Sequence, residues 1–239
     1  MRPEEIVNRM LEKYATCKSY EDSGYLENFA EGDERSKAIL VKFRTLYKTP
    51  FFFRFEWLER PYPASQWNEG VLGCDGEVAF TKWHKDGYKV RPTLKHAIAE
   101  MNMISYNSVA QISQHFPDLD LLPVAFFDRH KELMMIGKED ANGTECYCIG
   151  STLKHPHDKF MWISCEDFSI RRVKTYQFAD RTFIADLIAE IRKTTGPDAD
   201  VSHLEGDLAE PKRVYTEKHY EEVAFGKEIP DESFAPPQA

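Results

Sequence analysis

The chain has 239 residues, of which 42% are hydrophobic and 13% aromatic, and this balance excludes a disordered protein. The net charge is -9 and the isoelectric point about 5.4, and no basic cluster occurs beyond Arg171 and Arg172, which argues against a nucleic-acid partner. No apolar run approaches the roughly 20 residues that span a bilayer, so we expect no transmembrane segment.

The first part of the chain predicts a helix followed by strands. Residues 3–14 carry apolar side chains at helical spacing, and Pro3 with two following glutamates suits a first turn. From residue 19 the apolar spacing changes to two, which predicts strands over residues 20–29 and 37–47. The second of these strands places Val41 and Phe43 on one face.

The next segment is the most aromatic in the chain, reading Thr-Pro-Phe-Phe-Phe-Arg-Phe-Glu-Trp over residues 49–57. Because side chains alternate between the two faces of a strand, Phe51, Phe53, Phe55 and Trp57 are expected on one face. Four rings in a row need a large apolar volume opposite them. That volume is either a packed core or a cavity filled by an apolar ligand, and the residues alone leave both open.

A hairpin and then a helical block follow. An Asp-Gly turn at residues 75–76 between apolar runs predicts a hairpin over residues 71–83, and another strand covers 88–91. Over residues 93–126 the spacing becomes helical, with Leu94, Ile98, Met101 and Ile104 among the apolar positions. Flexible methionines suit a surface that adapts to different shapes. An ordinary helical layer over a sheet explains the same pattern.

Strands resume after residue 132, and the links between them are short. We expect a mainly β (α+β) fold of about ten or eleven antiparallel strands in a single domain, residues 1–239, with a helical insert at about residues 180–196. The strands predicted in this part cover residues 133–137, 144–150, 160–165, 168–174 and 213–226.

Sequence signatures of catalysis are missing from the chain. It contains no G-x-S-x-G, no glycine-rich phosphate loop and no His-Glu-x-x-His. His155-Pro156-His157-Asp158 has the composition of part of a metal site, but polar residues after a strand more often form a plain turn. We therefore expect no enzyme activity, no metal and no cofactor; a hydrolase or isomerase without a local signature is the remaining alternative.

Several short segments occur in an order typical of one protein family. They are Cys17-Lys18-Ser19-Tyr20 after the first helix, residues 43–57, Cys74-Asp75-Gly76, Phe160 to Ile163 with Ile170 to Arg172, and the tail from Ile229 to Pro237. Together they resemble the LolA/LolB-type lipoprotein carrier superfamily, and most of all its divergent outer-membrane lipoprotein-sorting members. The resemblance covers most of the chain except the insert near residues 180–210.

This resemblance implies an incomplete antiparallel β-barrel around a hydrophobic cavity, with helices as a lid. The implied function is that of a non-catalytic periplasmic carrier for a lipid or an acylated lipoprotein, in a chain from which a signal peptide was removed. The alternative is an envelope-stress sensor or protein-interaction module with a partner in the cell envelope. The ligand-binding residues expected on this basis are Val41, Phe43, Phe51, Phe53, Phe55, Trp57, Leu94, Ile98, Met101 and Ile104.

One position departs from the family pattern. In the carriers, an arginine in the segment before the aromatic strand bonds to the lid and helps to govern its opening. Thr49 stands at the matching position here, and a threonine cannot supply the several donors of a guanidinium group. The opening mechanism of the carriers is therefore not expected to apply.

Overall fold

Eleven strands form one antiparallel sheet within the residues that the structure describes. The structure is a computed structural model, and it describes residues 1–30, 37–60, 65–101, 108–113, 115–116, 119, 133–151, 159–178 and 213–237, with isolated positions between 185 and 205. The strands are β1 (Ser19–Ala30), β2 (Ala38–Lys48), β3 (Phe52–Glu59), β4 (Asn68–Asp75), β5 (Ala79–Trp83), β6 (Gly87–Arg91), β7 (Leu133–Ala141), β8 (Thr144–Ser151), β9 (Lys159–Ser164), β10 (Ile170–Phe178) and β11 (Arg213–Phe225).

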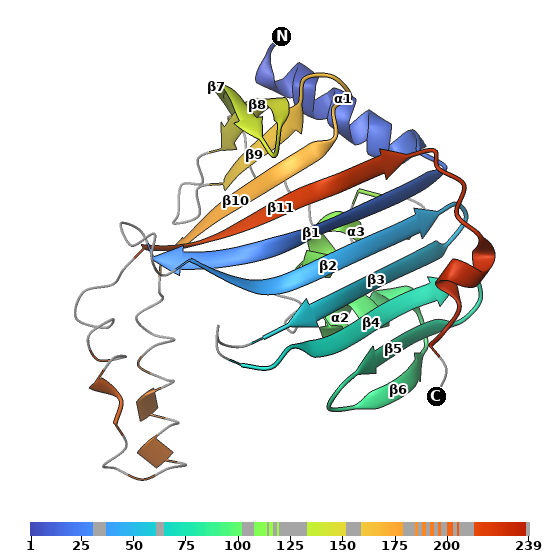
Figure 1. Ribbon diagram of the computed structural model, residues 1–239, viewed down its shortest axis with the longest axis vertical. Coiled ribbons are helices and arrows are strands. Elements are labelled where there is room, and N and C mark those ends of the chain that lie inside the picture. Colours follow the sequence, from blue (N-terminus) through green and yellow to red (C-terminus); the bar gives the residue numbers. More distant parts are fainter. Residues whose placement is uncertain are drawn as a thin grey trace.

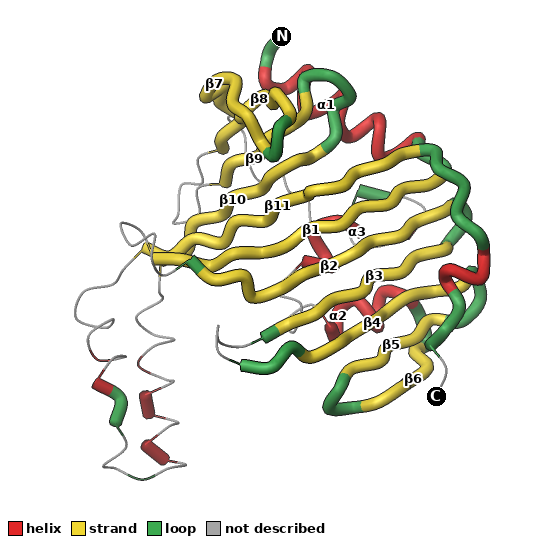
Figure 2. Tube along the Cα trace, viewed as in Figure 1, coloured by secondary structure: helices red, strands yellow, loops and turns green. Residues whose placement is uncertain are grey.

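The strand order across the sheet is β6-β5-β4-β3-β2-β1-β11-β10-β9-β8-β7. Two meanders, β1 to β6 and β7 to β11, are therefore joined by the pairing of β1 with β11 (Figures 1 and 2). The sheet stays open, with β6 and β7 at its edges. This arrangement confirms the expected mainly β fold, an incomplete antiparallel barrel with helices.

Helices pack on one face of the sheet, which we call the inner face. The helices are α1 (Pro3–Thr16), α2 (Leu94–Met101) and α3 (Ser108–Ser113), and Figure 1 shows α2 and α3 behind the sheet. Their buried apolar residues belong to the same core as the inward side chains of β1 to β4. The predicted insert at 180–196 and the residues around His155 lie largely or wholly outside the described residues.

The opposite face, the outer face, carries the C-terminal tail at one end. A short 3-10 helix, η3 (Asp231–Phe234), follows β11 and contacts β3 and β4 (Figure 1). Phe234 is fully buried against Phe52, Leu46 and Ile229. Arg54 donates a hydrogen bond from Nη1 to the carbonyl oxygen of Ala235 at 2.7 Å. Contacts with the outward side chains of β2 and β3 thus hold the tail in place.

The turn before β3 differs from the expected strand. β3 begins at Phe52, and Thr49 to Phe51 form a turn with a cis Thr49–Pro50 peptide bond. Phe51 has a φ of +64°, and its side chain is 50% exposed. A strand therefore starts one residue later than the aromatic alternation indicated, because the chain turns at Pro50 and takes Phe51 out of the pleat.

Tyr14 anchors α1 to the sheet. Its ring is fully buried and contacts the rings of Tyr20 and Phe225 at centroid distances of 5.3 and 5.0 Å. Its hydroxyl oxygen accepts a hydrogen bond from the backbone N–H of Ile170 at 3.1 Å. One side chain thus ties the helix to β1, β10 and β11.

Replacing Tyr14 with phenylalanine should leave the Ile170 N–H buried without an acceptor. We expect the free energy of unfolding to fall by about 1–2 kcal/mol, measured by urea denaturation. Tyr88→Phe, on the edge strand β6, is the matched control and should change stability far less. Equal losses in the two variants would contradict the anchoring role of the Tyr14 hydroxyl.

Candidate functional site

The inner face of β2 and β3 is an aromatic wall. Burial alternates along β3, so Phe53, Phe55 and Trp57 point inward and are at most 2% exposed. The rings of Phe55 and Trp57 lie 5.9 Å apart. On the neighbouring strand, the ring of Phe43 stacks on Phe55 at 6.0 Å with an interplanar angle of 13°, and Val41 is fully buried. A continuous row of rings therefore runs across the two strands.

Helix α2 lies over the strands next to this wall. Its inward positions Leu94, Ile98 and Met101 are buried, and the helix contacts β4, β5 and β6. These side chains belong to the same cluster as the wall residues. The apolar positions of α2, at helical spacing, and those of β3, at a spacing of two, therefore face the same apolar interior.

The structure brings together eight of the ten sequence-predicted ligand-binding residues: Val41, Phe43, Phe53, Phe55, Trp57, Leu94, Ile98 and Met101. Phe51 is apart from them, exposed in the turn before β3. Ile104 lies outside the described residues. Whether these residues contact a ligand stays a prediction.

A polar group occupies the interior beside the aromatic wall. Asp22 of β1 is fully buried, and its carboxylate oxygens accept hydrogen bonds from the Tyr20 hydroxyl at 2.6 Å and the Thr45 backbone N–H at 3.1 Å. Burial raises the pKa of Asp22 to about 6, and the hydrogen bonds from Tyr20 and Thr45 oppose part of that rise. A carboxyl group inside an apolar core is uncommon, so the buried carboxylate of Asp22 distinguishes this part of the interior from the purely apolar wall.

A buried lysine lies in the same interior. Lys218 of β11 is 3% exposed, and its ammonium donates a hydrogen bond to the carbonyl oxygen of Ser108, the first residue of α3, at 3.2 Å. The Nζ atom lies 5.6 Å from the centre of the Phe43 ring. Burial lowers the pKa of Lys218 to about 7, and the nearby charge of Asp22 opposes that shift.

The sequence contained a signal for both interior charges. Asp22 stands two residues from Tyr20, and Lys218 stands two residues from Tyr220. Strand alternation therefore places each charge on the face of a buried tyrosine. The signal was missed because Lys218 lies among other charged residues, which suggests a solvated strand.

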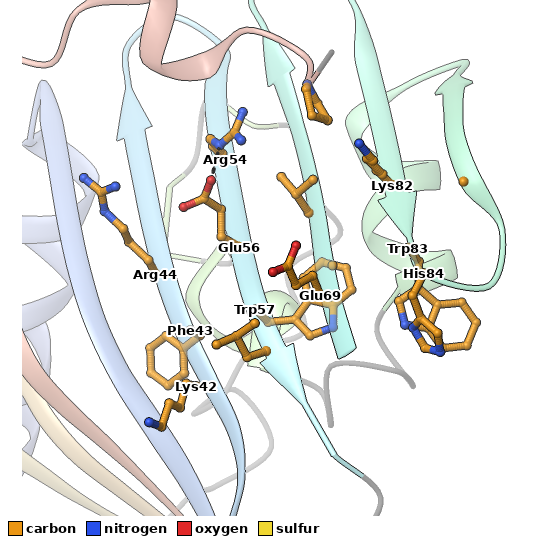
Figure 3. Close-up of a pocket in the computed structure, with 15 residues that line it drawn as sticks. Lys42, Phe43, Arg44, Arg54, Glu56, Trp57, Glu69, Lys82, Trp83 and His84 are labelled. Carbon is orange, nitrogen blue, oxygen red and sulfur yellow. Dashed lines mark hydrogen bonds and ion pairs between the residues drawn. The ribbon is translucent and has the colours of Figure 1, made fainter. Parts of the chain in front are cut away.

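A groove lies on the outer face of the sheet. Its volume is about 650 Å³, and it is crossed by charged side chains of β2, β3 and β4. Figure 3 shows Lys42, Arg44, Arg54, Glu56 and Glu69 in it, and marks the Arg54–Glu56 ion pair, which measures 2.8 Å. Apolar side chains, among them Leu58, Val71 and Trp83, line the same groove, so its surface is amphipathic.

A metal site and a membrane-spanning helix are both absent from the part of the chain that the structure describes. Within this part, no group of three His, Cys, Asp or Glu side chains is placed to hold a metal ion. None of its helices is both long and apolar enough to cross a membrane.

The fold is similar to solved structures of LolA superfamily proteins and their relatives, whereas no family model and no curated protein matches the sequence. LprF from Mycobacterium bovis is 10% identical with a TM-score of 0.47, over 99% of this chain and 97% of LprF. The LolA superfamily protein NE2245 from Nitrosomonas europaea is 10% identical with a TM-score of 0.34, over 99% and 98%.

The Pseudomonas aeruginosa MucA/MucB complex contains a chain that is 10% identical, with a TM-score of 0.38 over 98% of this chain. This chain spans about 61% of the length of that one. With sequence identities and TM-scores this low, the similarity concerns only the course of the backbone.

Proposed function

We propose that the protein is a non-catalytic binding protein that holds an acyl chain between the aromatic wall and helix α2. The observation that carries the proposal is the continuous row of Phe43, Phe55 and Trp57 rings, facing the interior that α2 covers. Helix α2 has 8 residues and α3 has 6, so each makes a limited set of apolar contacts with the core. Short elements held in this way can move aside at low cost to admit a ligand.

The energetics favour an apolar ligand at this place. Each methylene group that an acyl chain buries contributes about 0.8 kcal/mol, so a long chain binds without a polar anchor. The rings and the methionine of α2 supply the contact surface, and thioethers adapt to the shape of a flexible chain. We propose a lipid or an acylated lipoprotein as the ligand and the periplasm as the place where it is carried.

A pair of substitutions on one helix tests the proposal. Ile98→Gln places an amide in the inward face of α2, whereas Lys95→Gln places the same amide on its exposed face. A buried amide without a partner costs about 1–3 kcal/mol, so we expect Ile98→Gln to bind a fluorescent acyl probe about tenfold more weakly than the wild type. Lys95→Gln should bind it with unchanged affinity.

Native mass spectrometry of the gently purified wild type supplies a second readout. Co-purified lipid mass on the folded protein supports the proposal. A protein that carries no lipid and binds no acyl probe at any accessible concentration would refute it. Equal affinity of the Ile98→Gln and Lys95→Gln variants would place the probe away from α2.

The alternative function, a protein-interaction module, is favoured by the outer groove. Its mixed charged and apolar walls and its position beside the C-terminal tail suit an amphipathic segment of a partner protein in the cell envelope. Charge reversal at Lys42, which is exposed there, should weaken such a partner and leave acyl binding intact.

A further inference from the structure

The outer groove carries positive charge on two sides. Among the described residues that line it, four are lysine or arginine and two are glutamate, although the whole chain has a net charge of -9. Figure 3 shows Lys42 and Arg44 of β2 on one side of the groove and Lys82 of β5 on the other. Of the two glutamates, Glu56 is already paired with Arg54 at 2.8 Å. The groove is therefore a cationic region of an acidic protein.

The contacts on the β2 side leave this positive charge largely in place. The carboxylate of Glu21 is divided between Arg44 and Lys227, which both lie 2.7 Å from it, so one negative charge faces two positive ones. Lys42 lies over the ring of Trp67 at 5.6 Å. An aromatic ring attracts an ammonium group but does not neutralise its charge. This side of the groove can therefore attract an anionic partner.

An apolar strip runs between the two charged sides. Leu58 of β3 is paired with Lys42 of β2, and Val71 of β4 is paired with Lys82 of β5. The two apolar side chains thus stand between the cations. Three strand spacings separate β2 from β5, which is about 14 Å. An α-helix with its side chains is about 10–12 Å across, so one helix fits between the two sides.

The sheet also limits the kind of segment that the groove can hold. β3 and β4 are paired with strands on both sides, so a partner meets side chains here and has to satisfy its own backbone groups, as a helix does. The lining on β3 extends from Arg54 to Leu58, about 13 Å of strand, which about nine helical residues cover. The tail stands at one end, because Pro237 lines the groove and Arg54 holds the carbonyl oxygen of Ala235.

We propose that the outer groove binds a short amphipathic helix of a partner protein, whose apolar stripe is flanked by acidic residues. The stripe packs on Leu58 and Val71, and the flanking carboxylates reach Lys42 on one side and Lys82 on the other. This site lies on the opposite face of the sheet from the acyl site. The inference therefore gives the alternative function the chemistry of its partner and does not depend on an acyl ligand.

Two synthetic peptides that differ only in charge test this inference. Both are fluorescein-labelled peptides of about 14 residues with leucines at helical spacing, and the flanking positions hold glutamate in one and lysine in the other. We expect the wild type to bind the acidic peptide about tenfold more tightly, measured by fluorescence anisotropy at physiological salt. Non-specific attraction to a chain of net charge -9 favours the basic peptide, so the expected preference requires a cationic site.

Charge reversal on each face of the sheet locates the site. Lys42→Glu, in the groove, should weaken binding of the acidic peptide about fivefold, because it replaces an attraction with a repulsion. Lys95→Glu, on the exposed face of α2, changes the net charge by the same amount and is the matched control. Its affinity for the acidic peptide should stay close to that of the wild type.

The remaining outcomes would each overturn the inference. They are equal or tighter binding of the basic peptide, binding of neither peptide, and equal affinities of the Lys42→Glu and Lys95→Glu variants for the acidic peptide. The affinity of the same variants for a fluorescent acyl probe separates this result from a failure of the proposed function. It should stay at the wild-type value in both variants, whichever peptide binds.

Discussion

Replacing Gly24 with alanine should destabilise the protein by about 3 kcal/mol or more, because the new methyl group has no space. A Cβ atom at this position would lie 1.9 Å from the carbonyl oxygen of His219 and 2.9 Å from the ring of Phe43. The first of these atoms belongs to the backbone of β11, so a side-chain rotation cannot relieve the clash. Gly24 also stands where the register between β1 and β11 shifts, and this pairing joins the two meanders.

Gly137→Ala is the matched control for this prediction. A Cβ atom on Gly137 of β7 meets nothing within 4 Å, and the residue also stands at a register shift. Urea denaturation of both variants should therefore separate them by about 3 kcal/mol. A Gly24→Ala protein as stable as the control would show that β1 and β11 can move apart without cost, and would contradict the close pairing.

The strands could be predicted from the sequence, but the pairing of the first strand with the last could not. Alternation along residues 20–29 and 213–226 identified β1 and β11. Alternation also indicates which face of a strand is apolar, but it contains no information about a partner almost 200 residues away. Alternation alone therefore predicts two groups of strands on either side of the helical block, and their union in one incomplete barrel was expected only from the family resemblance. The pairing of β1 with β11, which joins the two groups, appears in the structure.

The candidate site shows a similar division. The aromatic wall follows from a spacing of two in β3, and the α2 residues follow from helical spacing, so both could be predicted. The position of Phe51 could not, because a turn at Pro50 removes it from the strand. The burial of Lys218 could not be predicted either, because its hydrogen bond to the Ser108 carbonyl forms only where α3 packs against β11. Local patterns give the direction of a side chain, and tertiary packing decides what it meets.

The carboxyl group of Asp22 should make stability depend on pH between about 4 and 6.5. Its pKa is about 6 in the folded protein against 3.8 for an unperturbed carboxyl, so the folded state binds the proton more tightly. The contribution is most favourable below pH 3.8 and is lost as the pH rises through 6, where the buried group must ionise. Over this window the loss amounts to roughly 2 kcal/mol.

The wild-type profile alone cannot reveal this effect, because His115 acts in the opposite direction. Burial lowers the pKa of His115 to about 4, so the unfolded state binds its proton more readily between pH 4 and 6.5 and stability rises with pH. The lowered pKa of Lys218, about 7, acts above this window. The two opposing slopes of Asp22 and His115 therefore partly cancel, and a variant is needed to separate them.

The Asp22→Asn variant separates the contribution of the Asp22 carboxyl group to stability from that of His115. The free energy of unfolding of the wild type minus that of Asp22→Asn should decrease by roughly 2 kcal/mol from pH 4 to pH 6.5, measured by urea denaturation at both values. Asp86→Asn, on the exposed turn between β5 and β6, controls for the loss of one charge, and its difference from the wild type should stay constant. An increase with pH in the Asp22 comparison would mean that Lys218 stabilises an ionised Asp22 more than burial opposes it. In that case the interior already holds a matched ion pair.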